Sequence, residues 1–286
     1  MIIQPLVSVL MTAYNREKYI AEAIESILVS TYKNFELIIV DDGSSDLTVS
    51  IIQSFRNIDN RIQFFVNEKN LGDYPNRNKA ASYAIGEYFI FVDSDDKIFP
   101  DTLEYLMMSM TISPEASIGM LCRDTSLKNM VLKTTDVIQH HFFKNHILTI
   151  GPGGTIVKTS FFNDIGKYPT QYGPANDMYF NLKAASLGNI KFLCKEFLFY
   201  RIHEGQESNN KLKYIYYNYN YFKNALENLD LKLSKKHVDI LLKKNKRRVV
   251  INAIRIFLQE KSMKNVFIIV NKTNFTLKDL FQAIFN

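Results

Sequence analysis

The feature that most constrains the fold is a regular alternation, over the first hundred residues, of short apolar runs with amphipathic segments. The apolar runs are rich in β-forming residues and cover Leu6–Met11, Phe35–Val40, Ile62–Val66 and Tyr88–Val92. The segments between them have helical periodicity, over Tyr19–Val29, from Asp46 to about Phe55, and over Pro75–Ala84. This alternation predicts an α/β fold with a mostly parallel, Rossmann-like sheet that helices cover on both faces.

Polar clusters follow three of these runs, at the carboxyl ends where such sheets collect ligands. The clusters are Thr12–Asn15, Asp41–Asp46 and Asp93–Asp96. No Gly-x-Gly-x-x-Gly motif follows the first run and the sequence has no P-loop, so the commonest dinucleotide and triphosphate binding modes lack support. Carboxylates repel a diphosphate unless a divalent cation lies between them. Hard oxygen ligands favour Mg²⁺ or Mn²⁺ as that cation.

Charge divides the chain into two parts. Residues 1–210 contain 19 Lys+Arg against 24 Asp+Glu, whereas residues 211–286 contain 16 against 5. We therefore expect an acidic domain over 1–210 and a basic, aromatic-rich helical extension over 211–286. The polar segment Glu204–Asn210 is expected to form a loop between them.

Composition excludes several classes of protein. With 47% apolar and 22% charged residues, the chain is expected to form a packed core and not to be disordered. Cys122 and Cys194 lie far apart in the sequence and give neither a disulfide framework nor metal-ligand spacing, which favours a reducing compartment. No apolar run approaches the ~18 residues that span a bilayer. No basic region precedes Leu6–Met11, so no signal peptide is expected, and the predicted location is cytoplasmic.

Three ordered motifs together resemble the signature of glycosyltransferase family 2. They are Val7–Asn15 (VSVLMTAYN), Glu36–Asp46 (ELIIVDDGSSD) and Phe91–Asp96 (FVDSDD), and the resemblance runs over about residues 5–205. It implies the A-type glycosyltransferase fold, with a nucleotide-sugar-binding half over about 1–110 and an acceptor half over about 111–210. It also implies inverting, hexosyltransferase-type transfer from a nucleotide-diphospho-sugar, most simply a UDP-sugar. The acceptor would be a hydroxyl of a glycan or lipid-linked molecule in cell-surface polysaccharide assembly.

The resemblance makes Asp93-Ser94-Asp95 the Asp-x-Asp motif of the family. Asp95 is then the direct ligand of Mn²⁺ or Mg²⁺, and Asp93 reaches the ribose, or the metal through water. Ser94 is counted with them as a donor-binding residue. His203 lies in Tyr200–Ser208, which resembles the closing segment of the family, and is a candidate for the metal shell or the diphosphate. A solvated acidic turn and a structural histidine are the alternatives.

The same resemblance assigns the nucleotide base to residues after the first two strands. Asp42 is expected to accept from N3–H of uracil, with a backbone contact from Thr12 and the aromatic face of Tyr14 beside the base. Ordinary packing is the alternative for Tyr14. Asp41 is interpreted as a cap for the helix that follows.

Arg77 lies in Asn70–Asn78, a segment that resembles the donor-side loop of the family. A planar guanidinium suits phosphate, so Arg77 is expected to position the diphosphate or the ribose. Family members often have Ala-Arg-Asn-x-Gly here, whereas this chain has Ala80 in place of the final Gly. A surface charge on a helix is the alternative for Arg77.

Asp177 matches the position of the catalytic base of the family, usually written Glu-Asp or Asp-Asp, although Asn176 precedes it here. An inverting transfer needs one carboxylate to deprotonate the acceptor hydroxyl. The leaving nucleotide diphosphate is stabilised by the metal. A cap on the helix to Leu187 is the alternative use of this pair.

Two other parts of this half receive no chemical role. His140, His141 and His146 are expected at the surface or on the acceptor side. Gly151–Gly154 is expected to be a tight turn, which could also shape the acceptor pocket.

The basic extension after Lys211 fits two interpretations equally. Its helices contact an anionic inner-membrane surface, which would make the protein peripheral, or they pack on the catalytic domain with a solvated basic face. Nucleic acid is not favoured, because no recognised nucleic-acid module accompanies the basic residues.

Two other functions compete with the transferase. A nucleotidyltransferase would show a Gly-rich, basic loop after the first strand, which Thr12–Asn15 is not. A catalytically inactive sugar-nucleotide or membrane-binding module is compatible with Asn176. The retained Asp93, Asp95 and Asp177 argue against that module.

Overall fold

The computed structural model describes residues 4–203, 211–261, 263–276 and 279. Within them the chain forms two compact units. One comprises Met1–Tyr168 and Leu187–Ile202, and the other comprises Pro169–Ser186 and His203–Asn286. The expected loop Glu204–Asn210 lies outside the described residues.

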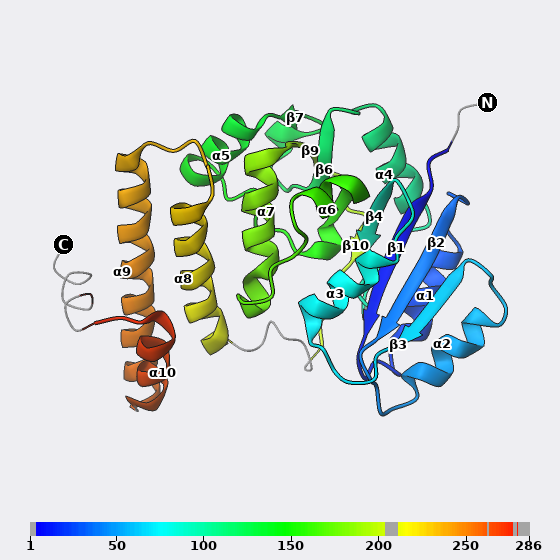
Figure 1. The fold of residues 1–286 in the computed structure, drawn as a ribbon, viewed down its shortest axis with the longest axis horizontal. Helices are drawn as coiled ribbons and strands as arrows, with labels where there is room; N and C mark the ends of the chain where they lie inside the picture. The colour runs from blue at the N-terminus through cyan, green and yellow to red at the C-terminus, as the bar shows by residue number, and fades with distance from the viewer. Residues whose placement is uncertain (1–3, 204–210, 262, 277–278, 280–286) are drawn as a thin grey trace. The chain divides into compact units, whose positions relative to one another are not determined.

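The first unit is built on an eight-stranded sheet (Figure 1). Its strands are Val7–Ala13 (β1), Phe35–Asp41 (β2), Ile62–Val66 (β3), Tyr88–Phe91 (β4), Ala116–Leu121 (β6), Val131–Leu132 (β7), Thr155–Lys158 (β8) and Asn189–Leu193 (β9). They lie in the order β3-β2-β1-β4-β8-β6-β9-β7. A two-stranded sheet pairs Lys97–Ile98 (β5) with Leu198–Phe199 (β10).

Strand direction determines which loops meet. β1 pairs in parallel with both β2 and β4, and β2 pairs in parallel with β3. β8 is antiparallel to both of its neighbours, β4 and β6, while β6 and β9 are parallel to each other. β6 and β9 therefore run in the same direction as β1. The carboxyl ends of β1, β2, β4, β6 and β9 share one edge of the sheet, which confirms the predicted, mostly parallel arrangement.

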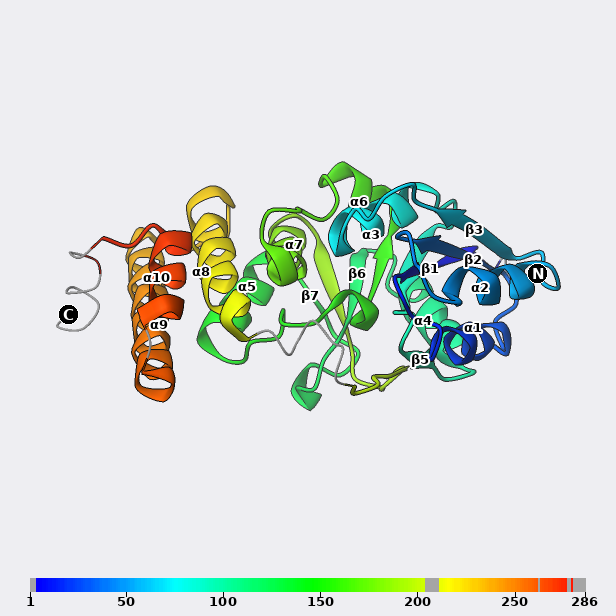
Figure 2. The same ribbon diagram turned by 90° about the horizontal axis from the view of Figure 1, so that it is seen from below.

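The described residues of this unit form six α-helices: Ile20–Leu28 (α1), Thr48–Arg56 (α2), Asp73–Ser82 (α3), Thr102–Thr111 (α4), Thr134–Phe143 (α5) and Thr159–Asp164 (α6). Figure 2 shows α1 and α4 on one face of the sheet, with α3 and α6 on the other. β1 and β2 are buried almost throughout, because neighbouring strands and helices surround them. This explains their mostly apolar sequences, in which the buried Ser8 and Glu36 satisfy each other by a hydrogen bond from the hydroxyl to the carboxylate.

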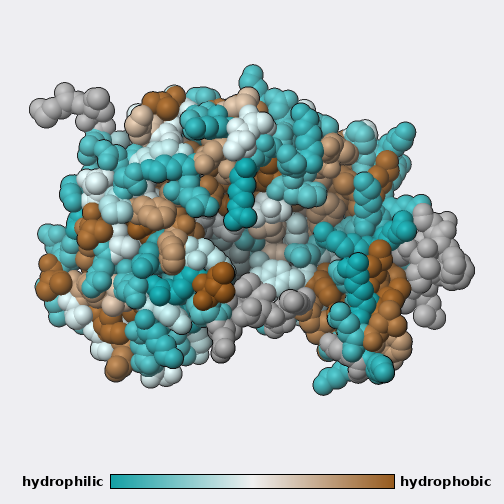
Figure 3. Space-filling view, turned by 180° about the vertical axis from the view of Figure 1, so that it is seen from behind, coloured by the Kyte–Doolittle hydropathy of each residue, from teal (hydrophilic) through white to brown (hydrophobic). Residues whose placement is uncertain are grey.

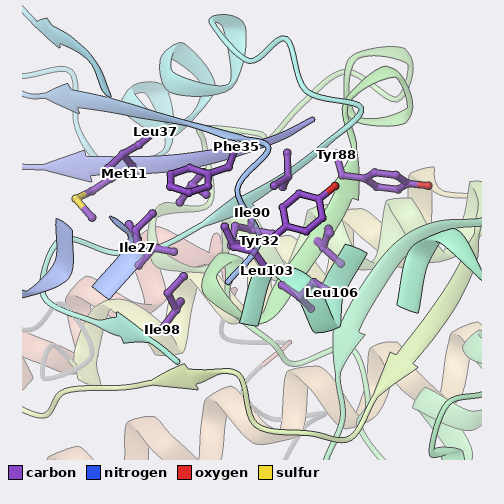
Figure 4. Packing of buried hydrophobic residues seen from close by; sticks show 14 of the residues in the cluster. Met11, Ile27, Tyr32, Phe35, Leu37, Tyr88, Ile90, Ile98, Leu103 and Leu106 are labelled. Carbon is purple, nitrogen blue, oxygen red and sulfur yellow. The ribbon is translucent and has the colours of Figure 1, made fainter. Parts of the chain in front are cut away.

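Alternate residues of each strand supply the two faces of the core. Met11 and Leu37 pack with Ile27 of α1 and Leu106 of α4 in one buried cluster (Figure 4). On the opposite face, the ring of Phe89 lies 4.9 Å from that of Phe162 in α6, in an edge-to-face arrangement. Side chains thus pack on both faces of the sheet, and this packing fixes the position of the carboxyl ends of its strands.

The second unit is helical. It contains most of Asn176–Leu187 (α7), together with Lys211–Asn228 (α8), Lys235–Glu260 (α9) and Met263–Thr273 (α10). Helices α8, α9 and α10 pack around Tyr219, Val249 and Ile269. The predicted helical extension is confirmed. Among the described residues, none of the helices combines the length and the apolar character needed to cross a membrane.

Candidate functional site

The three polar clusters expected at strand ends meet at the carboxyl edge of the sheet in the first unit. Ala13 lies opposite Asp41 in the register of β1 and β2, and the backbone N–H of Asp42 donates to the carbonyl of Ala13 at 2.8 Å. β1 continues through Thr12 to Ala13, so the expected end of this strand at Met11 is two residues short. Thr12 is half-buried, and the side chain of Tyr14 is 46% exposed at the edge.

The loops after β1 and β2 hold each other in place. The side-chain oxygen of Asn15 accepts from the backbone N–H of Ser45 at 2.9 Å, and the N–H of Asn15 donates to Oγ of Ser44 at 2.8 Å. Asn15 has φ of 53°, a left-handed conformation that asparagine tolerates better than most residues. This φ turns the chain away from β1 towards the loop after β2.

Asp41 stabilises a turn and not a helix. It is fully buried, and its Oδ1 accepts from the N–H groups of Gly43 and Ser44 at 3.0 and 2.8 Å. Gly43 has φ of +81°, which suits this tight turn. α2 begins only at Thr48, whose N–H donates to Asp46. The interpretation of Asp41 as a helix cap is therefore wrong.

Asp42 organises the donor-side loop. Its buried carboxylate accepts from Nδ2 of Asn67 at 2.7 Å and from the N–H groups of Leu71 and Gly72 at 2.8 and 2.9 Å. An ionised carboxylate has about four acceptor positions, so the chain itself uses most of this capacity. The first effect of Asp42 is to fix the loop that leads into α3.

Arg77 of α3 is buried, with 7% of its surface exposed, and is not the surface charge considered as its alternative. Its Nε donates to Asp73 and its Nη1 to Oδ1 of Asp93, each at 2.7 Å. Its guanidinium also lies 5.2 Å from the ring centre of Phe91. Burial alone would lower the pKa of Arg77, but the charges of Asp73 and Asp93 outweigh it and raise that pKa well above its ordinary value. Arg77 is a permanent cation beside the acidic motif.

Each acidic side chain that follows β4 has an arginine partner. Asp93 pairs with Arg77, and Oδ2 of Asp95 accepts from Nε of Arg16 at 3.2 Å. The carboxylate of Asp96 is buried and accepts from the backbone N–H of Arg201 at 2.9 Å. Ser94 is buried between them. These contacts relieve the repulsion within a segment of three carboxylates.

Burial raises the pKa of Asp96 to about 7. The charges of Asp93 and Asp95 add to this rise, while the hydrogen bond from Arg201 opposes it. Of the three carboxylates, Asp96 faces the protein interior, whereas Asp93 and Asp95 retain 30% and 14% of their side-chain surface. Asp93 and Asp95 are the two that a ligand at the edge can reach.

Sequence reasoning missed Arg16 and Arg201. Arg16 directly follows the polar cluster Thr12–Asn15, and its Nη1 also donates to the carbonyls of Tyr14 and Asn15. Arg201 follows β10, and its Nε donates to the carbonyl of Asp95 at 2.9 Å. The only sequence signal for either was its position next to a motif. Their pairing with Asp95 depends on strand ends that are distant along the chain.

The second unit contains Asp177 and His203. Asp177 is buried in the first turn of α7, and its Oδ1 accepts from the N–H of Met178 at 2.7 Å. The charge of Asp177 contributes to a raised pKa of about 12 for Tyr221 of α8, an effect caused first by burial of that phenol. His203 is half-buried at the end of the described segment.

Asn176 closes the turn before α7. Its side-chain oxygen accepts from the N–H of Tyr172 at 2.9 Å, and its Nδ2 donates to the carbonyl of Gly173 at 2.6 Å. A carboxylate at this buried position accepts one bond but donates none. The amide therefore has a structural reason to replace the acidic residue usual in the family.

Of the three histidines expected at the surface or on the acceptor side, His146 is exposed, whereas His140 and His141 are not at the surface. Both face inward from α5, with 9% and 6% of their surface exposed. His140 lies 3.2 Å from Oδ2 of Asp124, and Nδ1 of His141 accepts from the N–H of Leu148. Burial lowers the pKa of His141 to about 3, with His146 and His140 contributing repulsion. Gly151–Gly154 forms a short 3₁₀ turn over Pro152–Gly154, as its sequence predicts.

Asp93 and Asp95 have the donor chemistry that a divalent cation needs. Mg²⁺ in enzymes is commonly held by one or two carboxylates together with substrate phosphates, and Mn²⁺ accepts the same hard oxygens. In the part of the chain that the structure describes, no three His, Cys, Asp or Glu side chains gather as a self-sufficient metal site. The two carboxylates fit a cation that also takes oxygen ligands from a bound diphosphate.

Comparison with protein-family models matches residues 8–162 to the model described as glycosyl transferase family 2. An uncharacterised glycosyltransferase of Methanocaldococcus jannaschii is 34% identical over 214 residues, which cover 70% of this chain and 71% of that protein. The putative teichuronic acid biosynthesis glycosyltransferase TuaG of Bacillus subtilis is 45% identical over 101 residues. That match covers 35% of this chain and 40% of TuaG. The chain thus spans well under two thirds of several curated relatives that it matches.

Solved structures share the fold. Residues 1–349 of TarS from Staphylococcus aureus, in complex with UDP-GlcNAc, match with a TM-score of 0.73 and 24% identity over 97% of this chain and 81% of that one. The mannosyltransferase PcManGT of Pyrobaculum calidifontis, in complex with GDP-Man and Mn²⁺, matches with a TM-score of 0.65 and 15% identity. That match covers 99% of this chain and 87% of the other. The fold is therefore the A-type glycosyltransferase fold, and the family match covers more than half of the sequence: the chain belongs to glycosyl transferase family 2.

Proposed function

We propose that this protein is a metal-dependent, inverting glycosyltransferase that moves a hexosyl group from a UDP-sugar to a hydroxyl of a glycan or lipid-linked acceptor. The observation that carries the proposal is the acidic segment after β4, where Asp93 and Asp95 each pair with an arginine at the carboxyl edge of the sheet. TarS with UDP-GlcNAc has the same fold, and TuaG is named for teichuronic acid biosynthesis. The first supports a UDP-sugar as donor, and the second supports a role in cell-surface polysaccharide assembly.

In this proposal Asp93 and Asp95 hold Mn²⁺ or Mg²⁺ together with the diphosphate of the donor. The cation supplies positive charge that stabilises the leaving nucleotide diphosphate. PcManGT was solved with GDP-Man and Mn²⁺, which supports a divalent cation in this fold. Arg16, which pairs with Asp95, would be available to neutralise the phosphates of the donor. Arg77 would hold the carboxylate of Asp93 in place, where Asp93 would reach the ribose, or the cation through water.

The base of the nucleotide lies, in our proposal, at the loops after β1 and β2. The exposed ring of Tyr14 offers an aromatic face, Thr12 a backbone contact, and Asp42 the acceptor for N3–H of uracil. Three hydrogen bonds already hold Asp42, so its carboxylate is oriented before a ligand binds. Such preorganisation lowers the entropic cost of binding. Ser94 contributes to the same donor site.

We assign the acceptor chemistry to Asp177 and a donor contact to His203. Asp177 would deprotonate the acceptor hydroxyl as that oxygen attacks the anomeric carbon, which inverts the configuration there. His203 would contact the cation or the diphosphate. The resemblance of their segments to family motifs supports both assignments. The division of the chain into a transferase domain over 1–210 and an extension over 211–286 belongs to the same proposal.

We further propose that the extension contacts an anionic membrane surface, where a lipid-linked acceptor would lie. On α9, exposed Ile251, Ile254 and Leu258 alternate with exposed Arg247 and Arg255. Figure 3 shows hydrophobic and hydrophilic residues side by side on the C-terminal helices. Such a surface combines apolar insertion with attraction to acidic headgroups. The protein would then be cytoplasmic and peripheral to the membrane.

A thermal-shift panel tests the donor assignment. UDP, GDP, CDP and dTDP are each added with Mn²⁺ and with EDTA, because a ligand that binds only the folded state raises Tm. We expect UDP with Mn²⁺ to give the largest shift, and EDTA or Asp95→Asn to abolish it. A larger shift with another nucleotide would overturn the UDP assignment. No shift from a folded sample would contradict the transferase and leave the inactive membrane-binding module.

A further inference from the structure

The two cysteines, 72 positions apart in the sequence and expected to be unrelated, are neighbours in the fold. β6 and β9 pair in parallel with Leu121 opposite Leu193, and this is the last pair of the ladder before both strands end. The N–H of Cys122 donates to the carbonyl of Leu193 at 2.8 Å, which continues the parallel pattern by one residue. Cys122 therefore stands opposite Cys194.

This register suits a covalent link between the two side chains. Adjacent strands lie ~4.8 Å apart, and the Cα atoms of disulfide-bonded cysteines are about 4.4–6.8 Å apart. Residues opposite each other also point to the same face of a sheet. Sγ of Cys122 lies 3.9 Å and Sγ of Cys194 lies 3.7 Å from one atom, the carbonyl oxygen of Asp124. Both thiols are therefore directed to the same point.

The shared carbonyl is held rigidly. The carboxylate of Asp124 accepts from Oγ of Ser126 and from Nδ2 of Asn145, each at 2.6 Å, and lies 3.2 Å from Nε2 of His140. These bonds fix the segment that leaves β6, so the two thiols meet in a preorganised place. Burial differs between them, because Cys122 is buried while Cys194 is partly exposed.

The geometry points to a reversible cross-strand disulfide between Cys122 and Cys194, formed by exchange with a small-molecule disulfide of the glutathione type. The thiolate of Cys194 attacks one sulfur of the oxidant and expels one thiolate, which leaves a mixed disulfide. The thiolate of Cys122 then attacks Sγ of Cys194, closes the bond and expels the second thiolate. The two protons lost by the cysteines pass to the two departing thiolates, and the oxidant is reduced to two thiols.

A bound soft metal fits this place less well. Structural Zn²⁺ takes four ligands, and the described residues provide no cluster of three metal-binding side chains. Two thiols without further ligands favour oxidation over stable metal binding. Burial raises the pKa of both thiols, so the exchange should accelerate as the pH rises and thiolate forms.

The position gives the disulfide a local consequence. Cys122 and Cys194 follow strands that run parallel to β1, so they lie at the same edge of the sheet as the acidic motif. From Cys194 the chain passes to β10, which pairs with β5, and on to Arg201 at Asp96. The disulfide would anchor the start of this connection to the end of β6.

The test treats the full-length protein with oxidised glutathione at pH 8.5, blocks remaining thiols by alkylation, and maps disulfides by mass spectrometry of peptides. We expect a Cys122–Cys194 linked peptide, loss of both alkylation sites and recovery of both by dithiothreitol. Closing a loop of ~70 residues constrains the unfolded chain. The oxidised protein should therefore melt roughly 5–10 °C higher than the reduced protein.

Two variants test whether the disulfide depends on the proximity of the two cysteines or only on the reactivity of each thiol towards oxidised glutathione. Cys122→Ser should stop at a glutathione adduct on Cys194, and Cys194→Ser should give no cross-link and no Tm rise. If the buried Cys122→Ser variant does not fold, the more exposed Cys194→Ser variant still supplies the control. A lasting glutathione adduct on Cys194 of the natural sequence, or alkylation of both thiols after oxidant treatment, would overturn the inference.

Discussion

Arg77 and Asp93 form an ion pair in which Nη1 of the guanidinium lies 2.7 Å from Oδ1 of the carboxylate, beside the Phe91 ring. The pair joins α3 to the end of β4. Because Arg77 is buried and Asp93 is partly exposed, the protein interior holds the cation while the carboxylate can still reach a ligand. The acidic motif is thus positioned by a helix whose entry loop is held by Asp42.

Replacing Arg77 by Gln should destabilise the protein strongly. The substitution removes a buried, charged hydrogen-bond donor from the partly exposed carboxylate of Asp93, and losing such a bond costs about 1.5–3 kcal/mol. Asp73→Asn is the matched control, because the side chain of Asp73 is 55% exposed and its contact with Arg77 is screened by water. We expect its cost to be below about 1 kcal/mol. Urea unfolding measures both, and equal losses would contradict the role given to Asp93.

Replacing Asn176 by Asp should also reduce stability, although it restores the residue type usual in the family. The new carboxylate cannot donate to the carbonyl of Gly173, and it buries a charge next to Asp177. A lost buried donor costs about 1–3 kcal/mol. The exposed Asn60→Asp is the control and should change the free energy of unfolding by less than about 0.5 kcal/mol. A stable Asn176→Asp protein would show that the amide is not needed for the turn.

His141 should make the fold sensitive to acid. Its pKa in the folded state is lowered to about 3 by burial, whereas an unfolded histidine titrates near 6.5. Between these two values the unfolded chain binds a proton that the folded protein does not. Stability is therefore retained above pH ~6.5 and lost as the pH falls, by up to about 1.4 kcal/mol per pH unit.

The variant His141→Asn tests this, because the asparagine oxygen can replace Nδ1 as the acceptor for Leu148. Urea unfolding measures the free energy of unfolding from pH 7 to pH 4. For the variant this free energy should fall less steeply as the pH falls, and the difference in slope should correspond to nearly one bound proton. An unchanged slope would mean that His141 is protonated in the folded protein.

The membrane proposal predicts binding to vesicles that contain anionic lipid. Lys243, Lys244 and Arg247 are exposed on α9, and each basic residue near such a surface contributes about 1 kcal/mol. Changing all three to Glu should abolish co-sedimentation with phosphatidylglycerol vesicles. The same change at exposed Arg56, Lys69 and Lys128 of the first unit alters net charge equally and should preserve much more binding. If both triple variants lose vesicle binding equally, binding depends on the net charge of the protein and not on the surface of α9, which would contradict the proposal.

The sequence predicted local elements well where apolar residues recur over a short stretch. β3 occupies Ile62–Val66 as expected, and α7 spans Asn176–Leu187. Both are short-range patterns, in which the spacing of apolar residues along a few positions indicates the element. The antiparallel insertion of β8 was not predicted, because its four residues read like any other buried strand.

For the candidate site, the sequence predicted the positions of the motifs but not the contacts that their side chains make. The polar ends of β1, β2 and β4 were expected at one edge, and they meet there. The partners of the acidic residues were not predicted, because Arg16 and Arg201 approach from loops 79 and 106 positions away from Asp95. The pairing of Cys122 with Cys194 depends likewise on strand register. Such contacts follow from the order of strands, which sequence periodicity does not contain.

The central claim is that Asp95, held by Arg16 in the free protein, binds a donor nucleotide through a divalent cation. Calorimetric titration of UDP into the protein with Mn²⁺ tests it most directly, with Asp95→Asn as the variant and Asp59→Asn, in the loop before β3, as the matched control. We predict saturable binding for the natural sequence and for Asp59→Asn, and at least about tenfold weaker binding for Asp95→Asn, equal to about 1.4 kcal/mol. Binding of UDP that is equally tight in Asp95→Asn, or unchanged by EDTA, would contradict the account.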